Sequence, residues 1–267
     1  MFDTAAEASG GEPKRDAMPT MGFLDHLEEL RRRLVYSIAA VAVGFVTCWW
    51  KVEKIYDIMQ RPIMDALRAN GMSEKLVYLN PTEPFNLYLK ISALAGLFLT
   101  SPLVLYQVWM FISPGLYRNE KRYVVPFMVS TIALFSAGGY FGYRVVYPQA
   151  LGFLIHFGRQ FQPMITIGEY TSLFLSIILG MGLIFEMPIL IFFLSLMGIV
   201  SAGFMWKNFR YAILLIFIIA AIVTPTPDVL NMCIFAAPMV ALYGFSIGIA
   251  WLVHPKQRRA RKEKKAT

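Results

Sequence analysis

Residues 171–197 read TSLFLSIILGMGLIFEMPILIFFLSLM, a run in which Glu186 is the single side chain that can carry a charge. An α-helix rises about 1.5 Å per residue, so a run of this length is long enough to cross roughly 30 Å of hydrocarbon. Pro188 lies within the run, and prolines are tolerated in such helices because neighbouring helices satisfy the freed backbone groups. The stretch therefore predicts a membrane-spanning helix.

The rest of the chain has the same character. Of its 267 residues 57% are hydrophobic and 16% are charged, and the mean hydropathy is +0.54. This composition is too apolar for a fold that must present a polar surface to water. It predicts an all-α membrane protein with six transmembrane helices. They are expected at Leu34–Trp50, Phe85–Ile112, Val124–Tyr147, Thr171–Met197, Tyr211–Val223 and Cys233–Val253.

The last two predicted spans are unusual. Tyr211–Val223 covers only about 20 Å at the helical rise, which is less than the hydrocarbon thickness. Pro238 lies near the start of the sixth span, so we expect its regular part to be short as well.

The Lys and Arg side chains predict the orientation. Cytoplasmic loops carry an excess of them, and an N-terminus in the cytoplasm puts most of the basic residues there, so both termini are expected to be cytoplasmic. These residues are Lys14, Arg15, Arg31, Arg32, Arg33, Arg118, Lys121, Arg122, Lys207 and Arg210, followed by the basic C-terminal tail. We predict a disordered tail at 1–20, a membrane domain at 21–253 and a basic cytoplasmic tail at 254–267.

The formal net charge of +8 invites a comparison with nucleic-acid-binding proteins. The basic tail could contact RNA, but a run of cations directly after an apolar helix more simply faces anionic lipid. We therefore expect the lipid bilayer, and no nucleic acid, among the partners.

The first outer loop has a helical pattern of its own. Apolar side chains recur there at helical spacing and alternate with charged ones, which indicates an amphipathic helix lying on the surface. The apolar positions are Val52, Ile55, Tyr56, Met59, Ile63 and Leu67. We expect this helix to be broken at Pro62 and to cap the bundle without spanning the membrane.

Two carboxylates precede the first span. Glu28 and Glu29 stand four residues before Arg32 and Arg33, so each can form a local ion pair worth a few tenths of a kcal/mol. Alternatively, a carboxylate here is offered to a partner, because guanidinium binds carboxylate through two parallel hydrogen bonds. Glu120, between the second and third spans, could likewise pair with its basic neighbours or bind a partner.

Glu186 lies well inside the fourth span, where a charged carboxylate costs about 2.5 kcal/mol or more. It could be protonated and hydrogen-bonded to a neighbouring helix, with Gln107 of the second span as a candidate partner. It could instead line a polar cavity used by a substrate, which we favour because ionisable groups inside a membrane are generally functional.

Three segments carry a resemblance to a known family. They read HLEELR at 26–31, PLVLYQVWMFISPGLYRNEK at 102–121 and FEMP at 185–188. In this order, in a six-span chain with TPTPD at 224–228 after a short fifth span, they resemble the TatC family, the core receptor subunit of the twin-arginine protein translocase. The resemblance covers about residues 21–253.

The resemblance implies a cupped arrangement of six helices. It also implies that the chain binds the paired arginines of signal peptides on folded cargo at the cytoplasmic face. By motif position, Glu29 and Glu120 would receive the arginines, with Phe111 beside them. Glu28 is an extra neighbour whose role the motif does not define.

Further roles are carried over from the family in the same way. Glu186 would be the polar group of the concave face, and Pro62 and Pro102 would be structural prolines. Thr224 and Asn231 would contact single-span partners of the TatA and TatB type. The family also implies the bacterial cytoplasmic (inner) membrane, self-association in a larger complex, and no catalytic residue, metal or cofactor.

Two other functions compete with this one. A small ion-coupled secondary transporter would also hold a carboxylate in the membrane, but it would usually show internal repeats with paired broken helices, and the halves show no convincing repeat. An intramembrane enzyme is disfavoured because His26, His156 and His254 lie outside the predicted spans, and no Ser–His pair or zinc motif reaches membrane depth.

Overall fold

The computed structural model describes residues 23–73, 75–112, 124–158, 161, 164–223 and 229–266. Apart from one isolated bridge, this part of the chain forms helices and the turns between them. The helices are α1 (Phe23–Trp49), α2 (Val52–Ala69), α3 (Glu83–Ile112), α4 (Val124–Phe141), the π-helical η3 (Gly142–Val146), α5 (Tyr147–Phe157), α6 (Ile167–Ile184), α7 (Met187–Leu196), α8 (Ala202–Lys207), α9 (Phe209–Val223) and α10 (Val229–Ala266).

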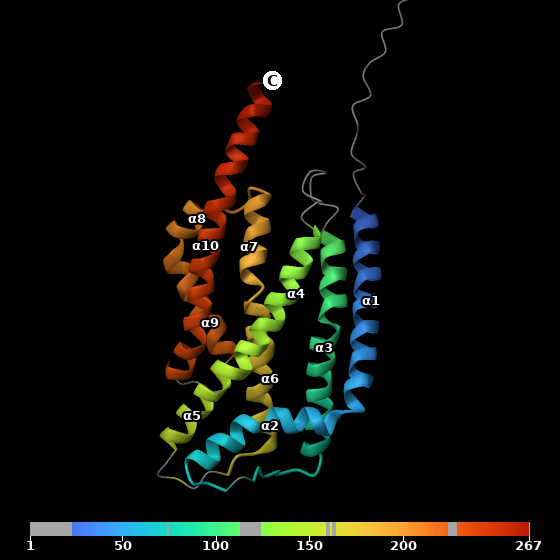
Figure 1. Cartoon of the computed structure of the whole chain (residues 1–267), viewed down its shortest axis with the longest axis vertical. Helices are drawn as coiled ribbons and strands as arrows, with labels where there is room; N and C mark the ends of the chain where they lie inside the picture. Colours follow the sequence, from blue (N-terminus) through green and yellow to red (C-terminus); the bar gives the residue numbers. More distant parts are fainter. Residues whose placement is uncertain are drawn as a thin grey trace, which may run out of the picture.

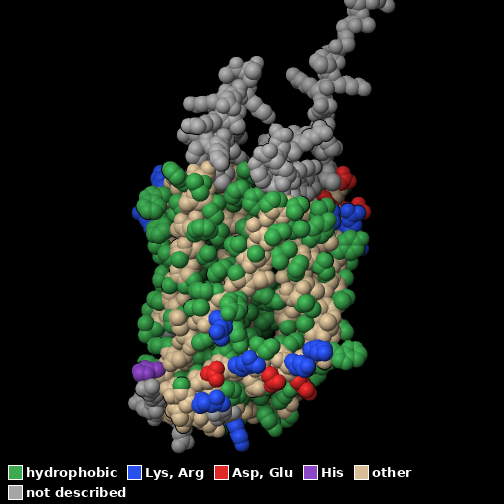
Figure 2. Space-filling model, in the orientation of Figure 1, with side chains coloured by type: hydrophobic (Ala, Val, Ile, Leu, Met, Phe, Trp, Pro, Cys, Tyr) green, Lys and Arg blue, Asp and Glu red, His purple; other side chains and the backbone are tan. Residues whose placement is uncertain are grey.

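The six-span membrane fold is confirmed. Within the described residues, five helical stretches are long and apolar enough to cross a membrane, and α9 is a shorter apolar helix. The five are Leu24–Trp49, Glu83–Phe111, Val125–Phe157, Ile167–Leu196 and Met232–Leu252. Figure 1 shows these helices as a bundle, with α2 lying across one end and the start of α1 and the end of α10 at the other. On the face drawn in Figure 2, charged side chains gather around α2 and hydrophobic ones cover the middle.

Several predicted boundaries are wrong. The third span does not end at Tyr147, because the helix passes through η3 and continues as α5 to Phe157. The regular part of the sixth span is not short: α10 begins before Pro238 and continues to Ala266, through the basic tail. As the spans extend beyond the predicted ends, His26 and His156 lie on spanning stretches.

The predicted surface helix is present as α2, but it is not broken at Pro62. Proline has no N–H to donate to the carbonyl of residue i−4, which here is Ile58. The hydroxyl of Tyr143 donates to that carbonyl oxygen at 2.7 Å, and the hydroxyl of Tyr170 donates to the next one, Met59 O, at 2.6 Å. Tyr143 of η3 thus satisfies the carbonyl that the proline leaves open, Tyr170 of α6 adds a bond to the next carbonyl, and α2 continues.

The apolar face of α2 is buried as predicted. Met59, Ile63 and Leu67 are at most 2% exposed and belong to the main hydrophobic core. The charged side chains of the same helix are exposed, so α2 closes its end of the bundle without spanning it.

Pro102 lies inside α3, where its ring leaves the carbonyl of Phe98 without its helical donor. The hydroxyl of Ser101 donates to Phe98 O at 2.8 Å. The neighbouring side chain therefore compensates for this proline, and α3 remains one helix of 30 residues.

Helices α1 and α3 pack with their backbones in close contact. A Cβ atom added to Gly96 would lie 2.6 Å from the backbone nitrogen of Phe45, and one added to Gly44 would lie 2.7 Å from Gly96 O. Real Cβ atoms do not approach backbone this closely, so both positions require glycine. The close approach brings polar side chains of α1 within reach of α3.

Candidate functional site

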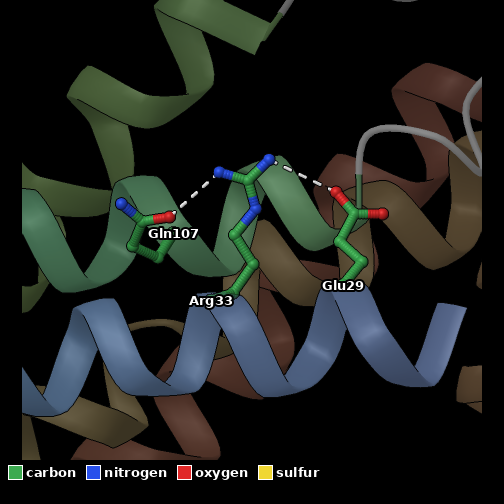
Figure 3. Close-up of polar contacts among 3 residues, drawn as sticks. All are labelled: Glu29, Arg33 and Gln107. Carbon is green, nitrogen blue, oxygen red and sulfur yellow. Dashed lines mark hydrogen bonds and ion pairs between the residues drawn. The ribbon is translucent and has the colours of Figure 1, made fainter. Parts of the chain in front are cut away.

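Glu29 lies in the second turn of α1, and its side chain is 11% exposed. Its Oε1 accepts a hydrogen bond from Nη2 of Arg33 at 3.3 Å, one helical turn further along (Figure 3). The local ion pair predicted for these two residues is therefore present. Because both side chains are largely buried, it differs from an ordinary surface pair, which contributes little.

Arg33 also connects α1 to α3. Its Nη1 donates to Oε1 of Gln107 at 3.1 Å, so one guanidinium joins a carboxylate on its own helix to an amide on the next (Figure 3). Gln107 is thus a partner of Arg33. The structure describes no hydrogen bond between Gln107 and Glu186, the pairing that the sequence offered as one alternative.

Two polar atoms of this group are buried without compensation. Neither Oε2 of Glu29 nor Nε of Arg33 has a hydrogen-bond partner among the described residues. Leaving a buried polar atom unpaired costs about 1–3 kcal/mol, and more when the group is charged. The site therefore presents a carboxylate oxygen that would gain from binding a cationic donor.

An aromatic pair joins the same parts of α1 and α3. Phe111, near the end of α3, stacks on His26 with ring centroids 4.4 Å apart and planes inclined by 17°. His26 precedes Glu29 by three residues and so lies on the same face of α1. The sequence did not predict this stack, although the i,i+3 spacing could have shown that His26 and Glu29 share a face.

Glu28 is exposed, and the pair predicted between it and Arg32 does not form within the described residues. Glu120 and Thr224 lie outside those residues, and so does the side chain of Asn231, whose backbone belongs to α10. From the predicted set, the structure links Glu29 to Gln107 through Arg33, and it places Phe111 against His26 of α1.

Glu186 stands apart from this group. It lies between α6 and α7, where the fourth span is interrupted just before Pro188, and its amide donates to Leu183 O in a tight turn. The side chain is half-buried, and its Oε1 has no partner among the residues that the structure describes. A polar atom in this state inside an apolar span calls for a water, a proton or a partner molecule.

No group of three or more His, Cys, Asp or Glu side chains in the described part of the chain could hold a metal ion. Fold and site together define a class: a helical multi-span membrane protein that holds a largely buried, partly unpaired carboxylate at the end of its bundle opposite α2.

Comparison with known proteins gives the family. The family model described as Sec-independent protein translocase protein (TatC) matches residues 25–238. A TatC protein of Koribacter versatilis is 66% identical over 249 residues, covering 93% of this chain and 92% of the relative. One of Aquifex aeolicus is 34% identical over 245 residues, covering 91% of this chain and 100% of the relative.

A solved structure agrees. The crystal structure titled Twin Arginine Translocase Receptor- TatC superimposes with a TM-score of 0.77 at 34% identity, covering 85% of this chain and 99% of that one. The chain belongs to the TatC family of Sec-independent protein translocase proteins. It is accordingly a translocase component of the bacterial inner membrane.

Proposed function

We propose that the chain is the receptor subunit of its translocase and that Glu29 receives an arginine of the signal peptide. The observation that carries this proposal is the unpaired, buried Oε2 of Glu29. Guanidinium is the cation that best satisfies a carboxylate, because its fork of N–H groups donates two parallel hydrogen bonds. The solved relative that matches this fold is named a twin-arginine translocase receptor.

The second arginine would be bound by Glu120, the other carboxylate that the resemblance to the family assigns to this role. Two separate carboxylates discriminate a pair of arginines from any isolated cation, and this matters because Lys and Arg are abundant in the cytoplasm. Phe111 and the ring of His26 would line the site, and Glu28 would add an exposed negative charge next to it.

This function requires the Glu29 end of the bundle to face the cytoplasm, with both termini on that side. The distribution of Lys and Arg supports this orientation. The start of α1 and the end of α10 both lie at the end of the bundle opposite α2 (Figure 1).

TatA- and TatB-type single-span proteins would associate with the membrane part, with Thr224 and Asn231 as contact points. Glu186 would be a polar group available to such a partner on the concave face, because its Oε1 is buried and no described residue pairs with it. The short helix α9 would thin the bilayer or recruit a partner there. We further propose self-association in a larger complex, and neither catalysis nor a cofactor.

Binding of signal peptides to the full chain in nanodiscs tests the receptor role. We expect an Arg-Arg peptide to bind more tightly than its Lys-Lys version. Glu29→Gln and Glu120→Gln should each weaken Arg-Arg binding by roughly tenfold or more, the size of one hydrogen bond between charged groups. Glu169→Gln, which removes an exposed carboxylate from the first turn of α6, is the matched control and should bind normally. Equal affinity of both peptides for all four proteins would defeat the proposal.

A further inference from the structure

The carboxylate that we assign to the signal peptide already holds a guanidinium of this chain. Nη2 of Arg33 lies 3.3 Å from Oε1 of Glu29, and the two side chains are 15% and 11% exposed. Oε2 of Glu29 and Nε of Arg33 face no partner in the residues described. The pair is therefore incompletely formed: a single long hydrogen bond stands where two parallel bonds are possible.

Arg33 has a second anchor that does not depend on Glu29. Its Nη1 donates to Gln107 Oε1 at 3.1 Å, on the neighbouring helix (Figure 3). A guanidinium has five N–H donors, and the bonds to Glu29 and Gln107 use two of them. If Arg33 gave up Oε1 of Glu29, its side chain would still be held by α3.

We propose that Arg33 is an internal surrogate for a signal-peptide arginine. It occupies one oxygen of Glu29 in the empty receptor and yields it when cargo binds, which makes Arg33 a specificity-determining residue. This inference rests on the proposed function of Glu29 as the carboxylate that receives an arginine.

Displacement of Arg33 favours arginine over lysine. An incoming guanidinium can use both oxygens of Glu29, so it gains two parallel bonds while Arg33 loses one. An ammonium is a compact point charge without this fork, and it can occupy Oε2 while Arg33 keeps Oε1. Two cations would then share a single carboxylate, which penalises lysine by repulsion as well as by geometry.

Removal of Arg33 should therefore relax specificity. In Arg33→Gln, Glu29 lacks its internal cation and accepts any positive charge more readily. We expect Lys-Lys peptides to bind more tightly, so that the ratio of Arg-Arg to Lys-Lys affinity falls by roughly tenfold, the size of one hydrogen bond to a charged group.

Gln107 provides a second test with a different signature. In Gln107→Leu, Arg33 loses its alternative anchor, and releasing Glu29 would leave the guanidinium partly buried and unpaired. Arg-Arg binding, which requires the displacement of Arg33, should weaken, and Lys-Lys binding should stay unchanged. The ratio of Arg-Arg to Lys-Lys affinity should therefore fall. Arg33→Gln lowers the ratio through a gain for Lys-Lys.

The experiment measures both peptides against the full chain in nanodiscs, with folding verified by the thermal unfolding of each variant. Arg33→Lys retains a cation that can pair with Glu29 at the same spacing. The ratio of Arg-Arg to Lys-Lys affinity in Arg33→Lys should therefore lie within about threefold of the parent ratio. If Arg33 only joined α1 to α3, lysine would not restore this ratio. Equal weakening of both peptides in Arg33→Gln, without rescue by lysine, would overturn the inference.

Glu29→Gln separates the two proposals. If it leaves Arg-Arg binding unchanged, the receptor role of Glu29 fails and the surrogate role fails with it. If it weakens binding while Arg33→Gln leaves the affinity ratio unaltered, the receptor role stands and the surrogate role alone is rejected.

Discussion

The two ends of the helical bundle are built on opposite principles. At the α2 end, Met59, Ile63 and Leu67 are at most 2% exposed, and tyrosine hydroxyls satisfy the backbone around Pro62. At the other end, a carboxylate oxygen of Glu29 and a guanidinium nitrogen of Arg33 are buried and have no partner in the part of the chain that the structure describes.

This difference indicates where stability and recognition reside. Burial of apolar side chains and satisfied hydrogen bonds stabilise a fold, whereas unpaired polar atoms cost free energy and persist where a ligand supplies what is missing. We expect substitutions at the α2 end to change the free energy of unfolding, and substitutions around Glu29 to change signal-peptide binding.

The largest expected effect is at Ile63. Its side chain is fully buried in the main core, so Ile63→Ala removes apolar contacts and leaves a cavity. We expect a loss of about 2–5 kcal/mol in the free energy of unfolding. Unfolding by a denaturing detergent in mixed micelles measures this change.

Ile58→Ala is the matched control, because Ile58 lies on the same helix and is 51% exposed. It should change stability by less than about 0.5 kcal/mol. The protein that remains folded in Ile63→Ala should bind Arg-Arg peptides with the parent affinity. A specific loss of peptide affinity in folded Ile63→Ala would contradict the division between the two ends.

Gly96→Ala should have the next largest effect, and it acts on both properties. The added methyl group would lie 2.6 Å from the backbone nitrogen of Phe45, so α1 and α3 must separate. Overpacking of this kind costs about 1–3 kcal/mol. Separation also lengthens the contact between Arg33 and Gln107, so the affinity ratio for Arg-Arg over Lys-Lys should fall.

Gly248→Ala is the control for this substitution, because no atom lies within 4 Å of the Cβ that it would add on α10. Stability there should be unchanged or slightly higher, since alanine favours helix. Should Gly96→Ala retain the parent stability and peptide selectivity, the link between helix packing and the Glu29 site would be refuted.

The sequence predicted the helices of this fold better than the contacts between them. Long apolar runs located the spans, because hydrocarbon thickness sets a length that can be counted directly. The break expected at Pro62 was wrong because Tyr143, 85 residues from Ile58, donates to the carbonyl that the proline leaves free. A contact over such a sequence separation has no local pattern.

The candidate site shows the same limit. The pair of Glu29 and Arg33 is visible as i,i+4 spacing, since both residues share a helix. The bond from Arg33 to Gln107 spans 74 residues and depends on the packing of α1 against α3. The sequence offered Glu186 as a candidate partner for Gln107, whereas the hydrogen bond that the structure describes for Gln107 comes from Arg33.

Tyr143→Phe tests the hydrogen bonding at the α2 end. It removes the donor to Ile58 O and should lower stability by about 1 kcal/mol. In a Pro62→Ala background the alanine N–H can donate to the same carbonyl, so Tyr143→Phe should cost less there. Tyr140→Phe, at a 66% exposed position, is the control. Equal costs of Tyr143→Phe in both backgrounds would mean that the tyrosine and the proline are not coupled.

Glu186 falls outside the two-end comparison. Its Oε1, like the buried hydroxyls of Ser92, Tyr147 and Ser195, has no partner among the described residues and lies within a span, not at an end of the bundle. Replacing an unsatisfied buried polar group by an apolar one is neutral or stabilising, so Glu186→Leu should raise the free energy of unfolding by up to about 1 kcal/mol. Glu29→Leu should lower it, because Arg33 loses its carboxylate. Opposite signs in the two unfolding curves are thus the expected result.

Export of a twin-arginine cargo by the same two variants completes this test. If Glu186 contacts a partner helix, Glu186→Leu should impair export while leaving Arg-Arg peptide binding intact, because the group lies outside the Glu29 site. Glu29→Leu should impair both. A stabilised Glu186→Leu protein that exports cargo at the parent rate would remove Glu186 from the mechanism, and its unpaired oxygen would then need a local explanation such as a bound water.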